Sequence, residues 1–157
     1  MRDLNLEFFP LQNRSETDLG FPSGHRVGRI VLSVQENEKK HIVLDIIWDF
    51  DELVSWFNEN RAYMESESLP NFVEGGRSIY KSIEATYENF DAYLDDQLDE
   101  LFEYRHRHEV CFGMRGVKIP AIYIGIGELG PEVSGEGNGV PFCYTVDLKS
   151  FLEKLTN

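Results

Sequence analysis

Runs of apolar residues predict strands in the first third of the chain. Val27–Val34 is one such run, and His41–Trp48 (HIVLDIIW) is nearly continuous in β-branched and apolar side chains. A run of this kind is typical of a central strand that is buried on both faces. The polar residues Gln35–Lys40 lie between the two runs and predict a hairpin, and Leu4–Phe9 is a shorter candidate strand.

Two segments have the apolar spacing of helices. The first begins at Asp49, where Glu52 forms a candidate capping box, and extends to about Met64. The second extends from Ser78 to about Tyr104 without Pro or Gly. Its apolar side chains step by three or four residues and predict one inner stripe: Ile79, Ile83, Tyr87, Phe90, Leu94, Leu98 and Leu101. Such a helix would be about 40 Å long, so the sequence leaves open whether it bends or breaks.

The last third of the chain returns to strand-like patterns. Three runs are expected to form strands: Glu109–Met114, Pro120–Gly125 and Pro141–Val146. The glycine-rich segment Gly125–Gly139 is expected to be a flexible hairpin connection, and Asp147 is a suitable N-cap for a closing helix. The element order is roughly ββααβββα, without alternating βαβ units. This order predicts an α+β fold, with helices packed on a mainly antiparallel sheet.

Size and charge narrow the range of functions. The 157 residues fit a single globular domain over 1–157, and the formal net charge of −13 disfavours nucleic acid as a partner, because phosphate binding needs Lys and Arg. The N-terminus MRDLNLEFFP lacks the basic start and long apolar run of a signal peptide. No segment approaches the roughly 20 apolar residues of a membrane span. The sequence therefore predicts a cytoplasmic protein with no membrane partner.

The two cysteines have similar surroundings in the sequence. Cys111 and Cys143 each lie in an apolar, strand-like run. We expect both to be buried thiols, and the sequence leaves open whether they form one disulfide.

The least expected feature of the chain is its acidic segment. Glu84 to Glu103 contains eight acidic residues and no Lys or Arg. Five of the acids step by three or four residues and would follow one side of the second predicted helix: Glu84, Glu88, Asp91, Asp95 and Asp99. Like charges at this spacing repel by about 0.2–0.5 kcal/mol per pair. The fold gains nothing from such crowding, so the segment indicates a basic partner outside the chain.

Aromatic residues complete the predicted partner-binding set. At 100° per residue, Tyr93 lies on the far side of the helix and Phe102 on its acidic side, and aromatic side chains are favoured at interfaces. The set comprises Glu84, Glu88, Asp91, Tyr93, Asp95, Asp96, Asp99, Glu100 and Phe102. The alternative is that the acids form only a solvated surface of an acidic protein.

The motifs predict no enzyme, cofactor or metal site. Gly125–Gly130 spells G-x-G-x-x-G, but Pro131 follows where a nucleotide site needs a helix N-terminus. Glu103 and His106 have the spacing of a ligand pair in a helical di-metal site, but the chain has no second pair of this kind. No nucleophile has an activating base beside it in the sequence.

The chain resembles a class of bacterial inhibitors. The stretches IIWDFDELVSWFNENR and HEVCFGMRGVKIPAIYIGIGELGPEVSGE, with the size and charge, are similar to immunity proteins of contact-dependent growth inhibition and polymorphic toxin systems. The resemblance covers about residues 40–157. It implies a cytoplasmic protein that binds and neutralises one cognate toxin, often a basic nuclease. Two alternatives stay open: an enzyme of unknown reaction with a site near Gly125–Gly139, and an acidic adaptor domain without inhibitory activity.

Overall fold

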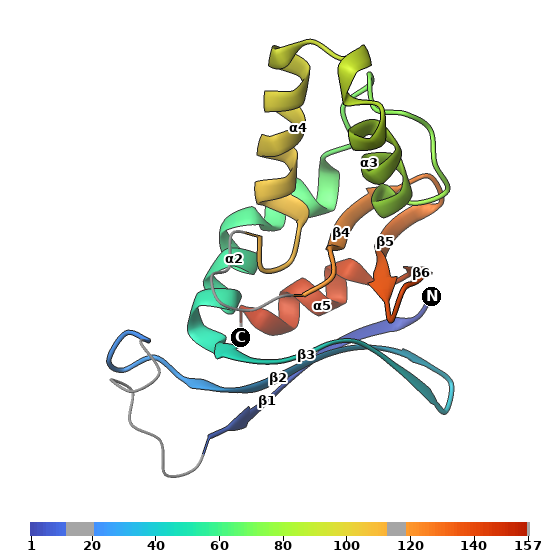
Figure 1. Cartoon of the computed structure of the whole chain (residues 1–157). Helices are drawn as coiled ribbons and strands as arrows, with labels where there is room; N and C mark the ends of the chain where they lie inside the picture. The colour runs from blue at the N-terminus through green and yellow to red at the C-terminus, as the bar shows by residue number, and fades with distance from the viewer. Residues whose placement is uncertain (12–20, 113–118, 157) are drawn as a thin grey trace. The chain divides into compact units, whose positions relative to one another are not determined.

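The computed structural model describes residues 1–11, 21–112 and 119–156. The chain forms two compact units, of which one comprises Met1–Glu59 with Asp147–Asn157 and the other Asn60–Val146. Each unit contains one sheet (Figure 1). The expectation of a single domain over 1–157 stays a prediction.

The fold class is α+β, as the sequence predicts. Two three-stranded sheets, in the orders β1-β2-β3 and β4-β5-β6, are antiparallel throughout, and the helices separate these two groups of strands in the chain. The candidate strand at the N-terminus is formed, so the chain begins with three strands rather than two. In the part of the chain that the structure describes, no helix has both the length and the apolar character needed to cross a membrane.

The sheet of the first unit consists of β1 (Asp3–Pro10), β2 (Val27–Glu36) and β3 (Lys39–Asp49). The predicted hairpin between the second and third strands is confirmed. The expectation that His41–Trp48 is the central strand is wrong, because β1 and β3 both pair with β2. On β3, Ile42 is 54% exposed, whereas the side chains of β2 are mostly buried.

Helices α2 (Phe50–Ser66) and α5 (Leu148–Leu155) supply the helical part of this core. The rings of Phe57 and Phe151 meet edge to face, with centroids 5.3 Å apart. The predicted N-cap of the closing helix is confirmed, because an Asp147 carboxylate oxygen accepts a hydrogen bond from the Ser150 amide at 3.1 Å.

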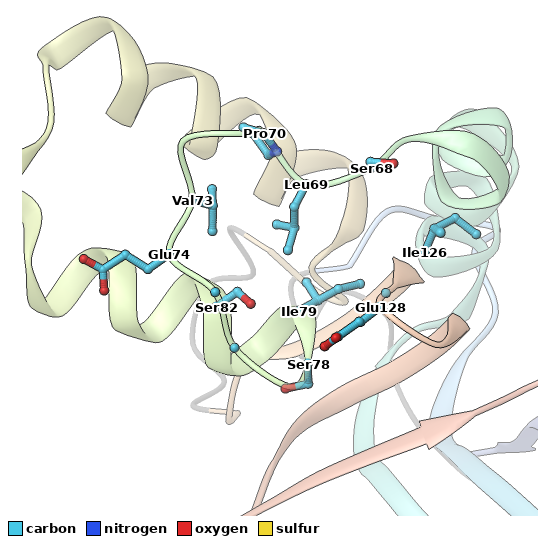
Figure 2. A pocket seen from close by; sticks show the side chains of 13 residues that line it. Ser68, Leu69, Pro70, Val73, Glu74, Ser78, Ile79, Ser82, Ile126 and Glu128 are labelled. Atoms are coloured by element: carbon cyan, nitrogen blue, oxygen red, sulfur yellow. The ribbon is translucent and has the colours of Figure 1, made fainter.

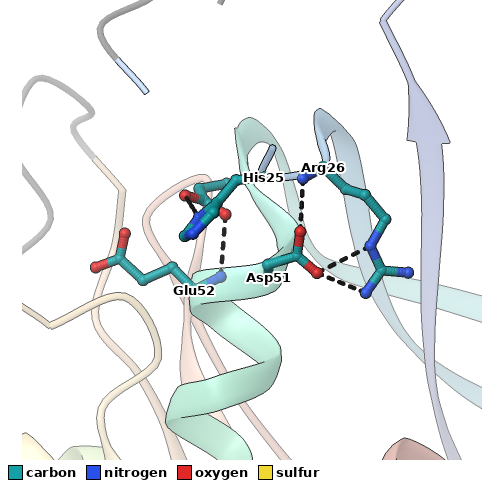
Figure 3. A network of polar contacts seen from close by, with 5 residues as sticks. His25, Arg26, Asp51 and Glu52 are labelled. Carbon is teal, nitrogen blue, oxygen red and sulfur yellow. Dashed lines mark hydrogen bonds and ion pairs between the residues drawn. The ribbon is translucent and has the colours of Figure 1, made fainter. Parts of the chain in front are cut away.

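The start of α2 is fixed by a polar network (Figure 3). As the sequence predicts, Asp49 caps the helix: its Oδ1 accepts a hydrogen bond from the Glu52 amide at 3.0 Å. Its other oxygen, Oδ2, lies 2.6 Å from Nδ1 of His25. The guanidinium of Arg26 donates to Oδ1 of Asp51 through Nε and Nη2, at 2.9 and 2.6 Å. These contacts tie the first turn of the helix to the segment before β2.

The sheet of the second unit consists of β4 (Ile122–Gly127), β5 (Gly130–Gly137) and β6 (Val140–Thr145). The expectation that Gly125–Gly139 is a flexible connection is therefore wrong: most of this segment is the central strand of a sheet. At the end of the neighbouring strand β4, glycine has a packing reason, since a Cβ at Gly127 would lie only 1.6 Å from Oε1 of the buried Glu132 on β5.

The second predicted helix is broken in the structure. It forms α3 (Ile79–Glu88), a short 3₁₀ turn η1 (Phe90–Ala92) and α4 (Asp95–His108). The two helices pack together as a helical hairpin, because buried residues of both belong to one apolar cluster. These residues are Ile79, Tyr80, Ile83, Leu101 and Tyr104. Figure 1 shows η1 at the end where the two helices join. A single straight helix would have kept these residues on separate turns along one axis.

Two further expectations need correction. The expected strand Glu109–Met114 is wrong in its described part: Glu109 makes an isolated bridge to Tyr123, and the residues directly after it form a turn. The last two residues of this expected strand lie outside the described ones. Cys111 is buried, as expected, but Cys143 is exposed. Side chains alternate between the two faces of a strand, and Cys143 lies on the less covered face of β6.

Candidate functional site

The break in the helix distributes the predicted partner-binding set over three elements. Glu84 and Glu88 belong to α3, Asp91 belongs to η1, and the four remaining acids of the set belong to α4. The expected continuous line of acids along one helix is therefore wrong. The acids instead occupy the outer part of the helical hairpin, and all of them except the half-buried Glu84 are exposed.

The exposed acids of the hairpin are not neutralised within the described structure. None of the seven acids in the predicted set forms an ion pair with a described basic residue. Three arginines of the same unit pair with other acids: Arg61 with Glu65, Arg105 with Glu109, and Arg107 with Glu67. The outer surface of the hairpin thus presents negative charge to the solvent.

Two of these acids have a structural role. Asp95 and Asp96 form the first turn of α4, where the positive end of the helix dipole stabilises negative charge by about 0.3–1 kcal/mol. The Gln97 side chain also accepts a hydrogen bond from the Leu94 amide at 2.9 Å, which caps the same end. The helix dipole therefore explains these two acids, but it does not explain Asp99 and the acids after it.

Apolar side chains are exposed among the acids. Phe90 is 54% exposed and Leu94 is 71% exposed, although the sequence pattern assigned both to the inner stripe. The break removes them from the packed faces of the two helices. Phe102 is 45% exposed, as expected of an interface candidate. Tyr93 is half-buried, with its ring centroid 5.9 Å from that of Phe72.

His108 anchors the C-terminal end of α4 in the core of the second unit. The ring is fully buried, and Nδ1 donates to the carbonyl oxygen of Ile124 on β4 at 2.8 Å. Its Nε2 lies 2.7 Å from Oε1 of Glu67, and its face stacks on Tyr104 with centroids 4.0 Å apart. Gly125 makes room for this contact, because a Cβ there would lie 2.7 Å from Nδ1.

The protonation of this cluster follows from burial and pairing. Burial lowers the pKa of His108 below its ordinary value of 6.5, and the hydrogen bonds to Ile124 and Glu67 oppose this shift only in part. Burial alone would raise the pKa of Glu67. The hydrogen bonds from Arg107, together with the contact to Nε2 of His108, outweigh that effect, so the pKa of Glu67 is lowered. The cluster is best explained as an anchor for the helix.

The N-terminal end of α3 is anchored to β5. The amide of Ile79 donates to Oε2 of Glu132 at 3.1 Å, and the amide of Tyr80 donates to Oγ of Ser134 at the same distance. Ser78 caps the helix by accepting from the Lys81 amide at 3.1 Å. These amides are the groups that a helix N-terminus would offer to a phosphate, and all three are occupied. The glycine motif therefore makes room for buried side chains and does not form a phosphate site.

The Glu103–His106 pair gives no metal site in the part of the chain that is described. Both side chains are exposed, and the His106 ring meets the rings of Phe102 and Phe112 edge to face. Among the described residues, no group of three or more His, Cys, Asp or Glu side chains is placed to hold a metal ion.

Sequence reasoning did not single out the buried His108, and the histidine that it weighed as half of a ligand pair was the exposed His106. The signal was present in the spacing, because Leu101, Tyr104 and His108 continue the inner stripe by steps of three and four.

Comparison of the chain with protein-family models, with curated proteins and with solved structures gave no match. Functional inference therefore rests on the chain's own geometry and charge.

Proposed function

We propose that the protein is an immunity protein, a non-enzymatic inhibitor that binds and neutralises a cognate toxin. The observation that supports this proposal is the exposed negative charge on η1 and α4, which has no ion-pair partner among the described residues. A basic protein surface is the partner that such a charge distribution favours. A nuclease domain fits this description, because its substrate groove must attract phosphate.

The apolar residues of the same surface supply the second requirement of an inhibitor, which is slow dissociation. Phe90 and Leu94 project among the acids and would lose contact with water on binding. Opposite charges mainly accelerate association, whereas buried anchors mainly slow dissociation. An inhibitor of this kind would act in the cytoplasm, without cofactor or metal.

A protection assay tests the proposal. The chain is expressed in bacterial cells together with a candidate toxic domain, for which the C-terminal region of the protein encoded immediately upstream is the first to test, and survival is measured. Charge reversal of Asp99, Glu100 and Glu103 to Lys is expected to abolish protection, because each reversal turns attraction to a basic groove into repulsion. These three residues are exposed on α4 and lie after its first turn. Each substitution is therefore expected to change the free energy of unfolding by less than about 0.5 kcal/mol.

A matched control makes the same change in net charge elsewhere. Glu38, Glu59 and Glu153 are exposed acids of the first unit and form no ion pair in the described structure. Their replacement by Lys is expected to leave protection intact. Full protection by the α4 variant would mean that the acids are only solvated surface. Equal loss of protection in both variants would mean that protection depends on the net charge of the protein and not on this surface.

A further inference from the structure

A pocket of about 400 Å³ lies in the second unit, away from the exposed acids of α4 (Figure 2). The segment after α2, the first turns of α3 and the end of β4 form its walls. Much of the lining is aliphatic, from Leu69, Val73, Ile79 and Ile126. The volume lies within the range of small-molecule sites, and an apolar wall with a few polar groups is typical of them.

One polar group that lines the pocket has no hydrogen-bond partner in the described structure. Ser82 is only 4% exposed, and its hydroxyl makes no hydrogen bond within the described structure. Figure 2 shows this hydroxyl turned into the pocket. Gly76 keeps the hydroxyl uncovered, because a Cβ at that position would lie 2.9 Å from Oγ. The hydroxyl is therefore available to form a hydrogen bond with a ligand in the pocket.

The charged side chains that line the pocket are acidic. Among the described residues, these are Glu74 and Glu128. The Glu74 carboxylate is turned away and accepts a hydrogen bond from Asn89 at 2.8 Å, whereas Glu128 is exposed at the rim. Behind Gly127 lies the carboxylate of Glu132, which is 2% exposed and has no basic partner among the described residues.

An anion does not fit this pocket. The amides at the start of α3 are bonded to Glu132, Ser134 and Ser78, so none of them is left for a phosphate. Negative charge in the pocket would also face the carboxylates of Glu128 and Glu132 in a partly desolvated place, where repulsion is stronger than in water.

We propose that this pocket binds an aliphatic cation, an alkylammonium or alkylguanidinium group, as a site separate from the proposed toxin surface. The stem of the ligand lies against Leu69, Val73 and Ile126. The cationic head donates a hydrogen bond to the Ser82 hydroxyl and is attracted by the carboxylates of Glu128 and Glu132. The same chemistry is found in a free amine and in the side chain of Lys or Arg from another protein.

The proposal is tested by titrating the full chain with pentylammonium and with pentylguanidinium, followed by calorimetry and by amide NMR shifts. We expect binding in the millimolar range, with the largest shifts at Gly76, Ser82 and Gly127. Pentanol and hexanoate have a similar stem without the cation and are expected to bind at least about fivefold more weakly. Equal binding of pentanol, or the absence of shifts at these three amides, would overturn the proposal.

Two variants separate the polar contacts from simple apolar burial. Ser82→Ala is expected to weaken pentylammonium binding by about 2- to 10-fold, and Glu128→Gln by about 2- to 5-fold. Because the Ser82 hydroxyl has no partner in the protein, its removal is expected to leave the melting temperature unchanged or raised. Glu59→Gln removes an exposed charge from the first unit and serves as the control. Variants that bind like the control would contradict the assignment.

The two sources of the cation are separated by a second pair of probes. Lysine blocked at both its amino and carboxyl ends represents a side chain on a protein, and pentylammonium represents a free amine. Comparable binding of both means that the pocket admits a side chain from a partner. Selective binding of pentylammonium means that it holds a free amine. Either result supports the cation site, and failure of both probes to bind rejects it without bearing on the toxin surface.

Discussion

His106 and His108 lie two positions apart on α4 and have opposite surroundings. His108 is fully buried between Glu67 and the Ile124 carbonyl, whereas His106 is exposed. Replacing His108 with Ala is expected to lower the free energy of unfolding by about 2–4 kcal/mol, because it opens a cavity and leaves the Ile124 carbonyl without its donor. His106→Ala is the control, with an expected loss below about 1 kcal/mol. Urea unfolding measures both, and equal losses would contradict an anchoring role for His108.

Gly127 on β4 and Gly137 on β5 differ in the space that a side chain would have. A Cβ at Gly127 would collide with Oε1 of Glu132, whereas a Cβ at Gly137 would meet nothing closer than 4.0 Å. Gly127→Ala is therefore expected to displace the Glu132 carboxylate from the Ile79 amide, at a cost of about 1–3 kcal/mol in the free energy of unfolding. Gly137→Ala is expected to have a smaller effect in the same thermal unfolding experiment. If Gly127→Ala lowers the free energy of unfolding no more than Gly137→Ala does, the Glu132 carboxylate moves without cost and this account is wrong.

The break between α3 and α4 shows how far the sequence predicts the elements. The apolar stripe correctly assigned the inner residues of both helices, but the absence of Pro and Gly concealed the break. Asn89 ends α3, and its amide donates to Thr86 while its side chain donates to Glu74. Asn and Asp favour caps and turns, so the sequence from Asn89 to Asp96 contained a local signal for a new helix start.

The sequence predicted the exposed acids of the candidate site, but it did not predict the exposed apolar residues among them. Repulsion at helical spacing correctly indicates that the acids are exposed, because unpaired carboxylates are almost never buried. Phe90 and Leu94 fit the spacing of a continuous helix, and only the tertiary break exposes them. The bonds of Ile79 to Glu132 and of His108 to Glu67 and Ile124 join residues far apart in the chain, and no local pattern predicts such contacts.

The start of α2 is expected to respond to pH through His25. The hydrogen bond with Asp49 raises the pKa of His25 above its ordinary value of 6.5. A raised pKa means that the protonated ring stabilises the fold fully below pH 6.5, and that this stability is lost as the pH rises through the raised value. The difference in stability between the wild type and His25→Gln should therefore shrink between about pH 5 and about pH 8. His108 titrates equally in both proteins, and a difference that does not change with pH would contradict this account.

At the scale of the whole molecule, the net charge of −13 determines how partners approach. Salt screens exposed charges over about 10 Å at 0.1 M, so affinity for the proposed toxin partner is expected to fall steeply as salt increases. Most of the change should appear in the association rate, which surface plasmon resonance measures directly. The variant with Lys at Asp99, Glu100 and Glu103 should lose most of the salt dependence. An affinity that is flat with salt would exclude a charge-led interface.

Among the described residues, the hydrogen bonds that join the helical hairpin to its sheet lie at its base. Ile79 and His108, at its two ends, bond to β5 and β4, whereas Phe90 and Leu94 lie at the opposite end and are exposed. Mutation of Ile79 or His108 at the base disturbs the hydrogen bonds to the sheet, whereas substitution of the exposed Phe90 and Leu94 side chains leaves these bonds in place. Under the proposed function, a lineage is therefore expected to change the exposed outer residues more readily than the base, and so to change its binding specificity without losing the fold.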